Sequence, residues 1–157
     1  MTNSNIKARG EFGEIERFFK TFLQQLRSVQ DDYAAELDSI GWETILEPET
    51  LARDSTLSGR KLTLQQATDA VAKHRTWTYV LYENARQRVR GLPVSEAIRQ
   101  EIASAFTREK VKALARHDQL WTFESRIIAK RQETIALLSS RRDGWAIEDG
   151  PDCICQR

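Results

Sequence analysis

The sequence has few of the residues that cross-link or interrupt a small domain. It contains two cysteines, three prolines and seven glycines among 157 residues. Cys153 and Cys155 lie close together in the C-terminal tail, so a disulfide between them would not join distant parts of the fold. A zinc site needs about four ligands, and only His74 and His117, both in predicted helices, could add to the thiolates. We therefore expect free tail thiols, no metal and no cofactor, with a redox or metal role of the tail as the alternative.

Long hydrophobic runs and an excess of one charge are also missing. No apolar stretch approaches the ~20 residues that span a bilayer, and residues 1–10 lack the apolar run of a secretory signal. Lysine and arginine total 24 against 23 acidic residues, which gives a formal net charge of +1. No field of the whole molecule would therefore draw it to nucleic acid or anionic lipid. We expect a folded cytoplasmic protein, one domain over residues 1–157, with no membrane contact and only local electrostatic recognition.

The alternation of polar and apolar residues that marks a strand is absent too, and helical spacing takes its place. Apolar residues recur at steps of three and four between residues 11 and 40, which predicts a first long helix ending at Gly41. Phe18, Leu23 and Ala34 widen this stripe, so we expect the helix to have more than one neighbour. The stripe consists of Phe12, Ile15, Phe19, Phe22, Leu26, Val29 and Tyr33.

The next helix is marked at both ends. Thr63 and Gln66 have the spacing of a capping box, which predicts that a second long helix begins there. Gly91, followed by Leu92-Pro93, predicts its end. The two long helices are therefore nearly equal in length.

Residues 95–140 can be divided in two ways. We expect a short helix from Pro93 or Ser95, a break near Phe106 with Thr107 as a cap, and a long final helix. The alternative is one uninterrupted helix of about 70 Å, which would overshoot its neighbours and expose an apolar end. Either way, the predicted buried face consists of Val111, Leu114, Trp121, Ile128, Ile135 and Leu138.

Residues 41–62 form the predicted long connecting loop between the first two helices, because the helical spacing fails there. Pro48 could begin one helical turn within it. A connection of this length is often functional, but its apolar side chains favour packing across the bundle. Those side chains are Trp42, Ile45, Leu46, Leu51 and Leu57.

Together these segments predict an all-α fold. It is an antiparallel up-and-down helical bundle with three long helices and one or two short ones. Residues 1–10 and 148–157 are expected to be flexible tails, and Trp145 and Ile147 to fold back over the end of the bundle.

No catalytic constellation stands out in the sequence. Ferritin-like metal sites place a glutamate three residues before a histidine on one helix face, but Val71 precedes His74 and Leu114 precedes His117 at that spacing. Both histidines are therefore expected to be ordinary partly buried or surface residues. A run before the second helix, with Ser58, Arg60 and Lys61, could bind an anion at helix-start N–H groups. It lacks the glycine spacing of a P-loop, so an ordinary solvated connection is the main expectation.

The last helix carries a basic stripe at steps of three and four. It should lie opposite the apolar face, where it could follow a phosphate backbone, with an aromatic ring to stack a base. Glu109, Glu124 and Glu133 flank the stripe and would dilute its field, so a charged solvent-facing surface is the main expectation. The stripe also includes Gln119, and its candidate binding residues are Arg108, Lys112, Arg116, Phe123, Arg126 and Lys130.

These features favour a binding role over an enzymatic one. The preferred hypothesis is a non-enzymatic module, either an adaptor, a chaperone-like protein or a structural subunit, that presents helix faces to a protein partner or to copies of itself. The alternative is a small helical subunit that binds nucleic acid through the basic stripe. An enzyme is the third option, for which a buried polar pocket with perturbed carboxylates would be the sign.

Overall fold

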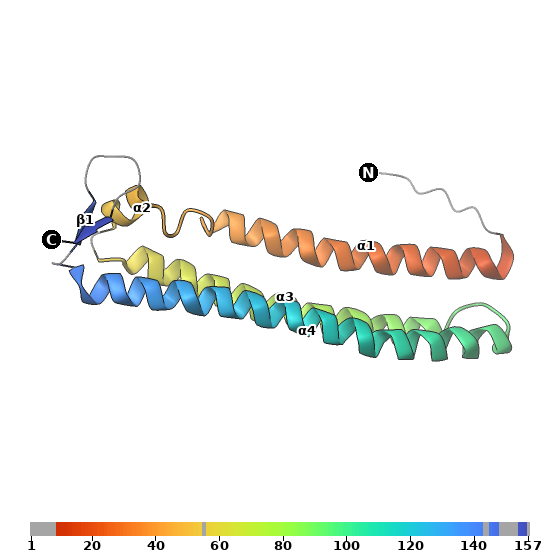
Figure 1. Ribbon diagram of the computed structural model, residues 1–157. Helices are drawn as coiled ribbons and strands as arrows, with labels where there is room; N and C mark the ends of the chain where they lie inside the picture. Colours follow the sequence, from red (N-terminus) through yellow and green to blue (C-terminus); the bar gives the residue numbers. More distant parts are fainter. Residues whose placement is uncertain (1–8, 55, 143–144, 148–153, 157) are drawn as a thin grey trace. The chain divides into compact units, whose positions relative to one another are not determined.

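A computed structural model describes residues 9–54, 56–142, 145–147 and 154–156. The chain is an all-α helical bundle, as predicted, with three long helices and one short helix (Figure 1). A pair of three-residue strands follows the last helix. In chain order the elements are α1 (Gly10–Ser39), α2 (Pro48–Arg53), α3 (Ser58–Arg90), α4 (Glu96–Ser140), β1 (Trp145–Ile147) and β2 (Ile154–Gln156).

A short strand pair accompanies the helices. β1 and β2 are antiparallel, with Trp145 opposite Gln156 and Ile147 opposite Ile154. These two strands leave the all-α class unchanged, and the flexible tail predicted for residues 148–157 stays a prediction. Three-residue strands are too short to show an alternating pattern, although Trp and Ile are enriched in strands. The backbone of β1 lies against α2, so this segment folds back as predicted, whereas residues 1–8, 148–153 and 157 lie outside the described residues.

The long helices contribute to two compact units. Unit 1 contains residues 1–31 and 74–119, and unit 2 contains residues 32–73 and 120–157, as far as they are described. The prediction of one domain over residues 1–157 stays a prediction.

In unit 1, α3 runs antiparallel to α4. The Nζ of Lys110 bonds to Glu83, and Arg75 reaches Asp118 with 2.9 Å between Nη2 and Oδ1. Later residues of α4 thus pair with earlier residues of α3, as the predicted up-and-down order requires.

Aromatic side chains fill the core of unit 1. The rings of Phe22 and Tyr82 lie 5.1 Å apart and those of Phe22 and Phe106 lie 5.6 Å apart, both nearly perpendicular. The predicted apolar stripe of α1 is therefore buried at Phe22, and Phe19 packs against the same cluster. Its first member, Phe12, is exposed, and Phe18 is buried instead. Because an α-helix has 3.6 residues per turn, a stripe at steps of three and four drifts around the helix, and near the start of α1 the face toward the core includes Phe18.

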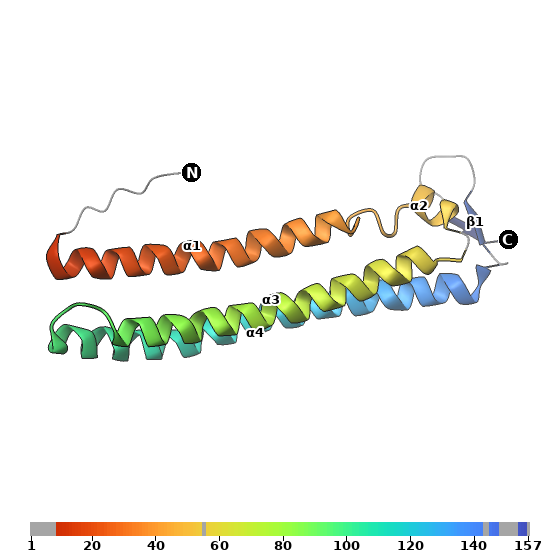
Figure 2. The same ribbon diagram turned by 180° about the vertical axis from the view of Figure 1, so that it is seen from behind.

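The connection between α1 and α3 helps to build the core of unit 2. Trp42, Ile45, Leu51 and Leu57 are buried together with side chains of α4, so the predicted packing is confirmed. Figure 2 shows α2, which is part of this connection, beside β1 in unit 2. α2 begins at Pro48, where one helical turn was predicted.

The connecting loop is shorter than residues 41–62, because α3 begins at Ser58 and not at Thr63. The carboxylate of Asp54 accepts a hydrogen bond from the backbone N–H of Arg60 at 3.2 Å, with further N–H bonds from Gly59 and Ser58. Asp54 thus caps the helix start from upstream. Thr63 is buried, and its hydroxyl donates to the carbonyl of Ile40 at 3.4 Å instead of capping a helix.

α4 is one uninterrupted helix of 45 residues, so the predicted break near Phe106 was wrong and the alternative of a continuous helix is correct. The overshoot that this alternative implied stays a prediction. The hydroxyl of Thr107 donates to the carbonyl of Ala103 four residues earlier at 2.7 Å, which keeps it inside the helix. In unit 2 the α1–α3 connection packs with Ile128 and Ile135 in one cluster and buries them.

The buried face of α4 differs from the prediction at Val111, which is exposed. Trp121, Ile128 and Ile135 are buried as predicted. None of the described helices is long and apolar enough to cross a membrane.

Candidate binding surfaces

The predicted basic stripe is on the surface of α4. Its six candidate binding residues and Gln119 are exposed, while Trp121 and Ile128 on the opposite face are buried. The stripe passes through both units. Unit 1 holds Arg108, Lys112 and Arg116, and unit 2 holds Phe123, Arg126 and Lys130.

Glutamates on the same helix pair with the lysines of the stripe. In unit 1 the Nζ of Lys112 lies 2.9 Å from Glu109 Oε1, and in unit 2 the Nζ of Lys130 lies 2.7 Å from Glu133 Oε2. The hydrogen bond and charge of Lys112 lower the pKa of Glu109 below its usual value. The glutamates therefore dilute the cationic field, as predicted. Exposed pairs of this kind add little to stability.

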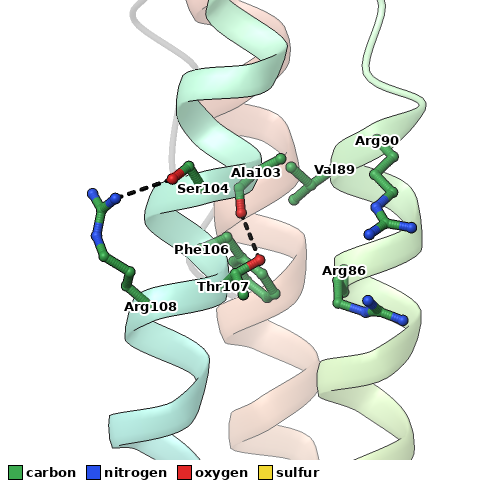
Figure 3. A pocket seen from close by; sticks show the side chains of 8 residues that line it. All are labelled: Arg86, Val89, Arg90, Ala103, Ser104, Phe106, Thr107 and Arg108. Atoms are coloured by element: carbon green, nitrogen blue, oxygen red, sulfur yellow. Dashed lines mark hydrogen bonds between the residues drawn. The ribbon is translucent and has the colours of Figure 1, made fainter.

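A groove that the sequence did not reveal lies in unit 1, between the end of α3 and the first turns of α4. Its volume is about 380 Å³, and Val89, Ala103 and Phe106 supply its apolar lining (Figure 3). Phe106 is only 7 % exposed because its ring belongs to the aromatic core. The groove therefore has a firm apolar floor.

Arginines stand on both rims of this groove. Figure 3 shows Arg108 reaching to the hydroxyl of Ser104, 3.0 Å away, on the α4 side, while the guanidinium groups of Arg86 and Arg90 lie along α3. Arg86 is paired with Glu83, with 2.7 Å between Nε and Oε1. In the described part of the chain, no carboxylate lies within ion-pair distance of Arg90 or Arg108.

The chain around the groove is more basic than the whole. Residues 86–112 carry seven Lys and Arg against three Asp and Glu, a net charge of +4. The arginines at the end of α3 also interact favourably with the C-terminal end of the helix dipole, so their presence in the sequence alone does not require a ligand. Only the pairing of α3 with α4 brings them beside Ala103 and Arg108, about 15 residues further along the chain.

The predicted anion loop already holds a carboxylate of the chain itself. Burial alone would raise the pKa of Asp54, but N–H bonds from Arg60, Gly59 and Ser58 and the hydroxyl of Thr56 lower it overall. Lys61 donates from Nζ to Ser139 Oγ at 3.2 Å. Ser58, Arg60 and Lys61 therefore surround an internal cap, and the helix-start N–H groups are used.

The two histidines occupy different environments in unit 1. His74 is 1 % exposed, and its ring lies 4.9 Å from that of Trp77. His117 is partly buried, with its Nε2 3.4 Å from the hydroxyl of Tyr82, and burial lowers its pKa. Among the residues that the structure describes, no three His, Cys, Asp or Glu side chains gather as metal ligands. The tail thiol of Cys153 lies outside those residues.

α4 also exposes large apolar side chains in unit 2. Leu120 and Phe123 are 54 % and 61 % exposed, although Trp121, Ile128 and Ile135 already fill the core from another face of the helix. Ile127, seven residues after Leu120, is half-buried on the same side. α4 thus has apolar residues on more than one face.

Comparison with known proteins gives no relative. No family model, no curated protein and no solved structure matches the chain.

Among the described residues, three carboxylates have a clearly shifted pKa. The carboxylates with shifted pKa values, Asp54, Glu83 and Glu109, are all lowered, by helix-start N–H groups or by neighbouring Lys and Arg. A general acid needs the opposite shift, toward neutral pH.

Proposed function

We propose that the protein is a non-enzymatic helical interaction module whose α4 helix contacts another protein chain. One observation carries the proposal: α4 exposes Leu120 and Phe123 in unit 2, although the core beneath the helix is complete without them. An apolar pair on a helix face, flanked by polar residues, is typical of a helix that docks on a partner. A cytoplasmic location stays a prediction, which fractionation of host cells would test.

The surroundings of these two side chains support a protein partner. Arg126, three residues after Phe123, is exposed, and aromatic and arginine side chains are enriched where interfaces gain most of their energy. Burying a leucine or phenylalanine side chain contributes roughly 1.5–3 kcal/mol. Burial of these two side chains could therefore supply most of the binding free energy of a complex of modest affinity.

Two charge-matched double variants test this proposal. L120E/F123E removes the apolar pair, and Q119E/T122E adds the same two charges at exposed polar positions of the same helix. Each tagged chain is expressed in the native host, crosslinked in cells and purified, and co-purifying proteins are quantified. We expect proteins recovered with the wild type to persist with Q119E/T122E and to fall at least about tenfold with L120E/F123E.

The outcome also identifies the kind of partner. An excess of untagged copies of the chain indicates self-association, and another protein indicates an adaptor. Equal recovery with both double variants, each shown to be helical by circular dichroism, contradicts the proposal.

Nucleic-acid binding is the second candidate, and the basic end of unit 1 favours it. Residues 86–112, which include the exposed Lys112, have a net charge of +4, and the exposed Arg116 continues this surface along α4. Cations that displace counterions from phosphates produce an affinity that falls steeply with salt.

The corresponding test is retention on an immobilised oligonucleotide as the salt concentration rises. K112E/R116E should be released at lower salt than the wild type, whereas R17E/R27E, an equal charge change on α1, should have a smaller effect. Absence of binding at low salt, or equal effects of the two variants, rules this candidate out.

A further inference from the structure

We infer that the groove between α3 and α4 in unit 1 binds an acidic segment of a partner protein that inserts one apolar side chain. This inference rests on the proposed function, because it names the chemistry of the partner. It concerns a different surface from Leu120 and Phe123.

The floor of the groove explains the apolar anchor. Val89 and Phe106 are buried core residues that face the groove with carbon atoms, and the small side chain of Ala103 leaves the space between the helices open. The volume of about 380 Å³ is at the lower end of the roughly 300–1,000 Å³ of ligand pockets. A leucine or phenylalanine side chain that enters such a space is itself removed from water. The floor gains little, because Val89 and Phe106 are already 0 % and 7 % exposed.

The rims explain why the flanking residues should be acidic. Arg90 of α3 and Arg108 of α4 line the groove, and among the described residues no carboxylate lies within ion-pair distance of either, although the charge of Arg108 acts on the neighbouring Glu109. The guanidinium of Arg108 bonds to Ser104 and would have to turn toward the groove to meet a ligand. An extended segment with carboxylates on both sides of its anchor would meet one arginine at each rim. Arginine also offers the planar fork of donors that carboxylates accept.

The same geometry disfavours two other anions. An inorganic phosphate needs donors that converge on one point, but Arg108 is turned toward Ser104, away from the α3 rim (Figure 3). Single-stranded nucleic acid gains much of its affinity from bases stacked on exposed rings, and Phe106 offers almost no free face. A peptide with both acidic and apolar side chains uses every part of the groove.

A synthetic peptide provides the probe. It is a fluorescein-labelled twelve-residue chain with a central leucine flanked by two glutamates on each side, and its binding to the full-length protein is followed by fluorescence anisotropy. Two control peptides replace the leucine by serine or the four glutamates by glutamine. We expect saturable binding of the probe, weaker at higher salt, and a loss of affinity of roughly tenfold or more for the serine peptide.

Variants of the protein locate the binding site. A103L fills the groove and should weaken the probe roughly tenfold. R90Q and R108Q should each weaken it up to about fivefold. R88Q is the matched control, because Arg88 lies over the ring of Phe18, 5.6 Å from its centre, and does not line the groove. Amide shifts of the wild-type protein give a second measurement, and they should be confined to residues 86–90 and 103–108.

Several results would overturn the inference. The glutamine peptide would bind as tightly as the probe. A103L would bind the probe like the wild type, and the amide shifts would lie outside residues 86–90 and 103–108. R88Q and R90Q would weaken binding of the probe equally. An oligothymidine of the same charge that binds more tightly than the peptide would assign the groove to nucleic acid. If the probe peptide does not bind but L120E/F123E still loses its co-purifying proteins, only this inference is wrong, because that double variant tests the proposed function separately.

Discussion

Asp54 shows how one carboxylate can decide where a helix begins. It lies four residues before α3, yet its side chain accepts N–H groups of the first helical turn. The capping-box pattern at Thr63 and Gln66 is a short-range signal, and burial of Thr63 under the end of α1 removes it from that role. Residue spacing in the sequence cannot identify a carboxylate that accepts the first helical N–H groups from the preceding loop.

We therefore expect D54A to destabilise the protein by about 1 kcal/mol, as the loss of a helix cap does. Urea unfolding measures the difference, and D31A, an exposed carboxylate at another position, is the control. The lowered pKa means that the contribution of Asp54 is present above its usual value of 3.8 and is lost as the pH falls through the lower folded-state value. A difference between D54A and wild type that persists at the lowest pH would show that the carboxylate charge is not involved.

His117 should give the stability of the protein a dependence on pH above the range of the carboxylates. Burial lowers the pKa of its imidazole below the usual value of 6.5. As the pH falls below 6.5, the unfolded chain therefore binds a proton that the native chain does not bind, and the free energy of unfolding decreases. The H117F variant should lose this part of the slope. Urea unfolding at pH 7.5 and pH 5.5 compares the two proteins, and equal slopes would contradict the assignment.

At the scale of elements, the helical periodicity predicted the long helices well and their interruptions poorly. Gly41 ends α1 as predicted, with a positive φ of 70° and an N–H bond from Trp42 to the carbonyl of Leu37. The break near Phe106 was wrong because a threonine cap and a helical threonine look alike in sequence. The groove could not be predicted, because it depends on which turns of α3 and α4 face each other, and periodicity does not fix that register.

The connection between α1 and α3 contains a further testable feature. Leu57 is the only described residue other than glycine with a positive φ, 56°, and it is 0 % exposed. That backbone conformation costs roughly 1–2 kcal/mol for a residue with a Cβ atom, whereas a fully buried leucine contributes more. Packing therefore holds the strained turn before α3.

At position 57, a glycine variant should consequently be more stable than an alanine variant, which is the reverse of the usual order. Both L57A and L57G lose the buried side chain, at about 2–5 kcal/mol, but glycine relieves the backbone, so L57G should be more stable than L57A by roughly 1 kcal/mol. Leu51 of α2, 1 % exposed and helical, is the matched control at which L51G should be the less stable variant. Urea unfolding of the four variants measures this. The same order at both positions would argue against the positive φ of Leu57.

At the scale of the whole molecule, each long helix contributes residues to both units. Residues 10–31 of α1 belong to unit 1 and its remaining residues to unit 2, and α3 and α4 are divided in the same way. The cores are separate, with Phe106 in one and Ile128 in the other. Helix formation is cooperative along a chain segment, so a helix that belongs to both cores links their unfolding through its backbone.

We expect one cooperative transition, in agreement with the prediction of a single domain. F106A should remove about 3–5 kcal/mol from the core of unit 1, and hydrogen exchange followed by mass spectrometry should then show faster exchange of the slowest amides in unit 2 by a similar free energy. I128A, which weakens the core of unit 2, should speed exchange in unit 1 in the same way. Exchange that quickens only in the substituted unit would mean that the units unfold separately. A partner bound in the unit 1 groove would then stabilise unit 1 alone, whereas cooperative unfolding extends that stabilisation to Leu120 and Phe123 in unit 2.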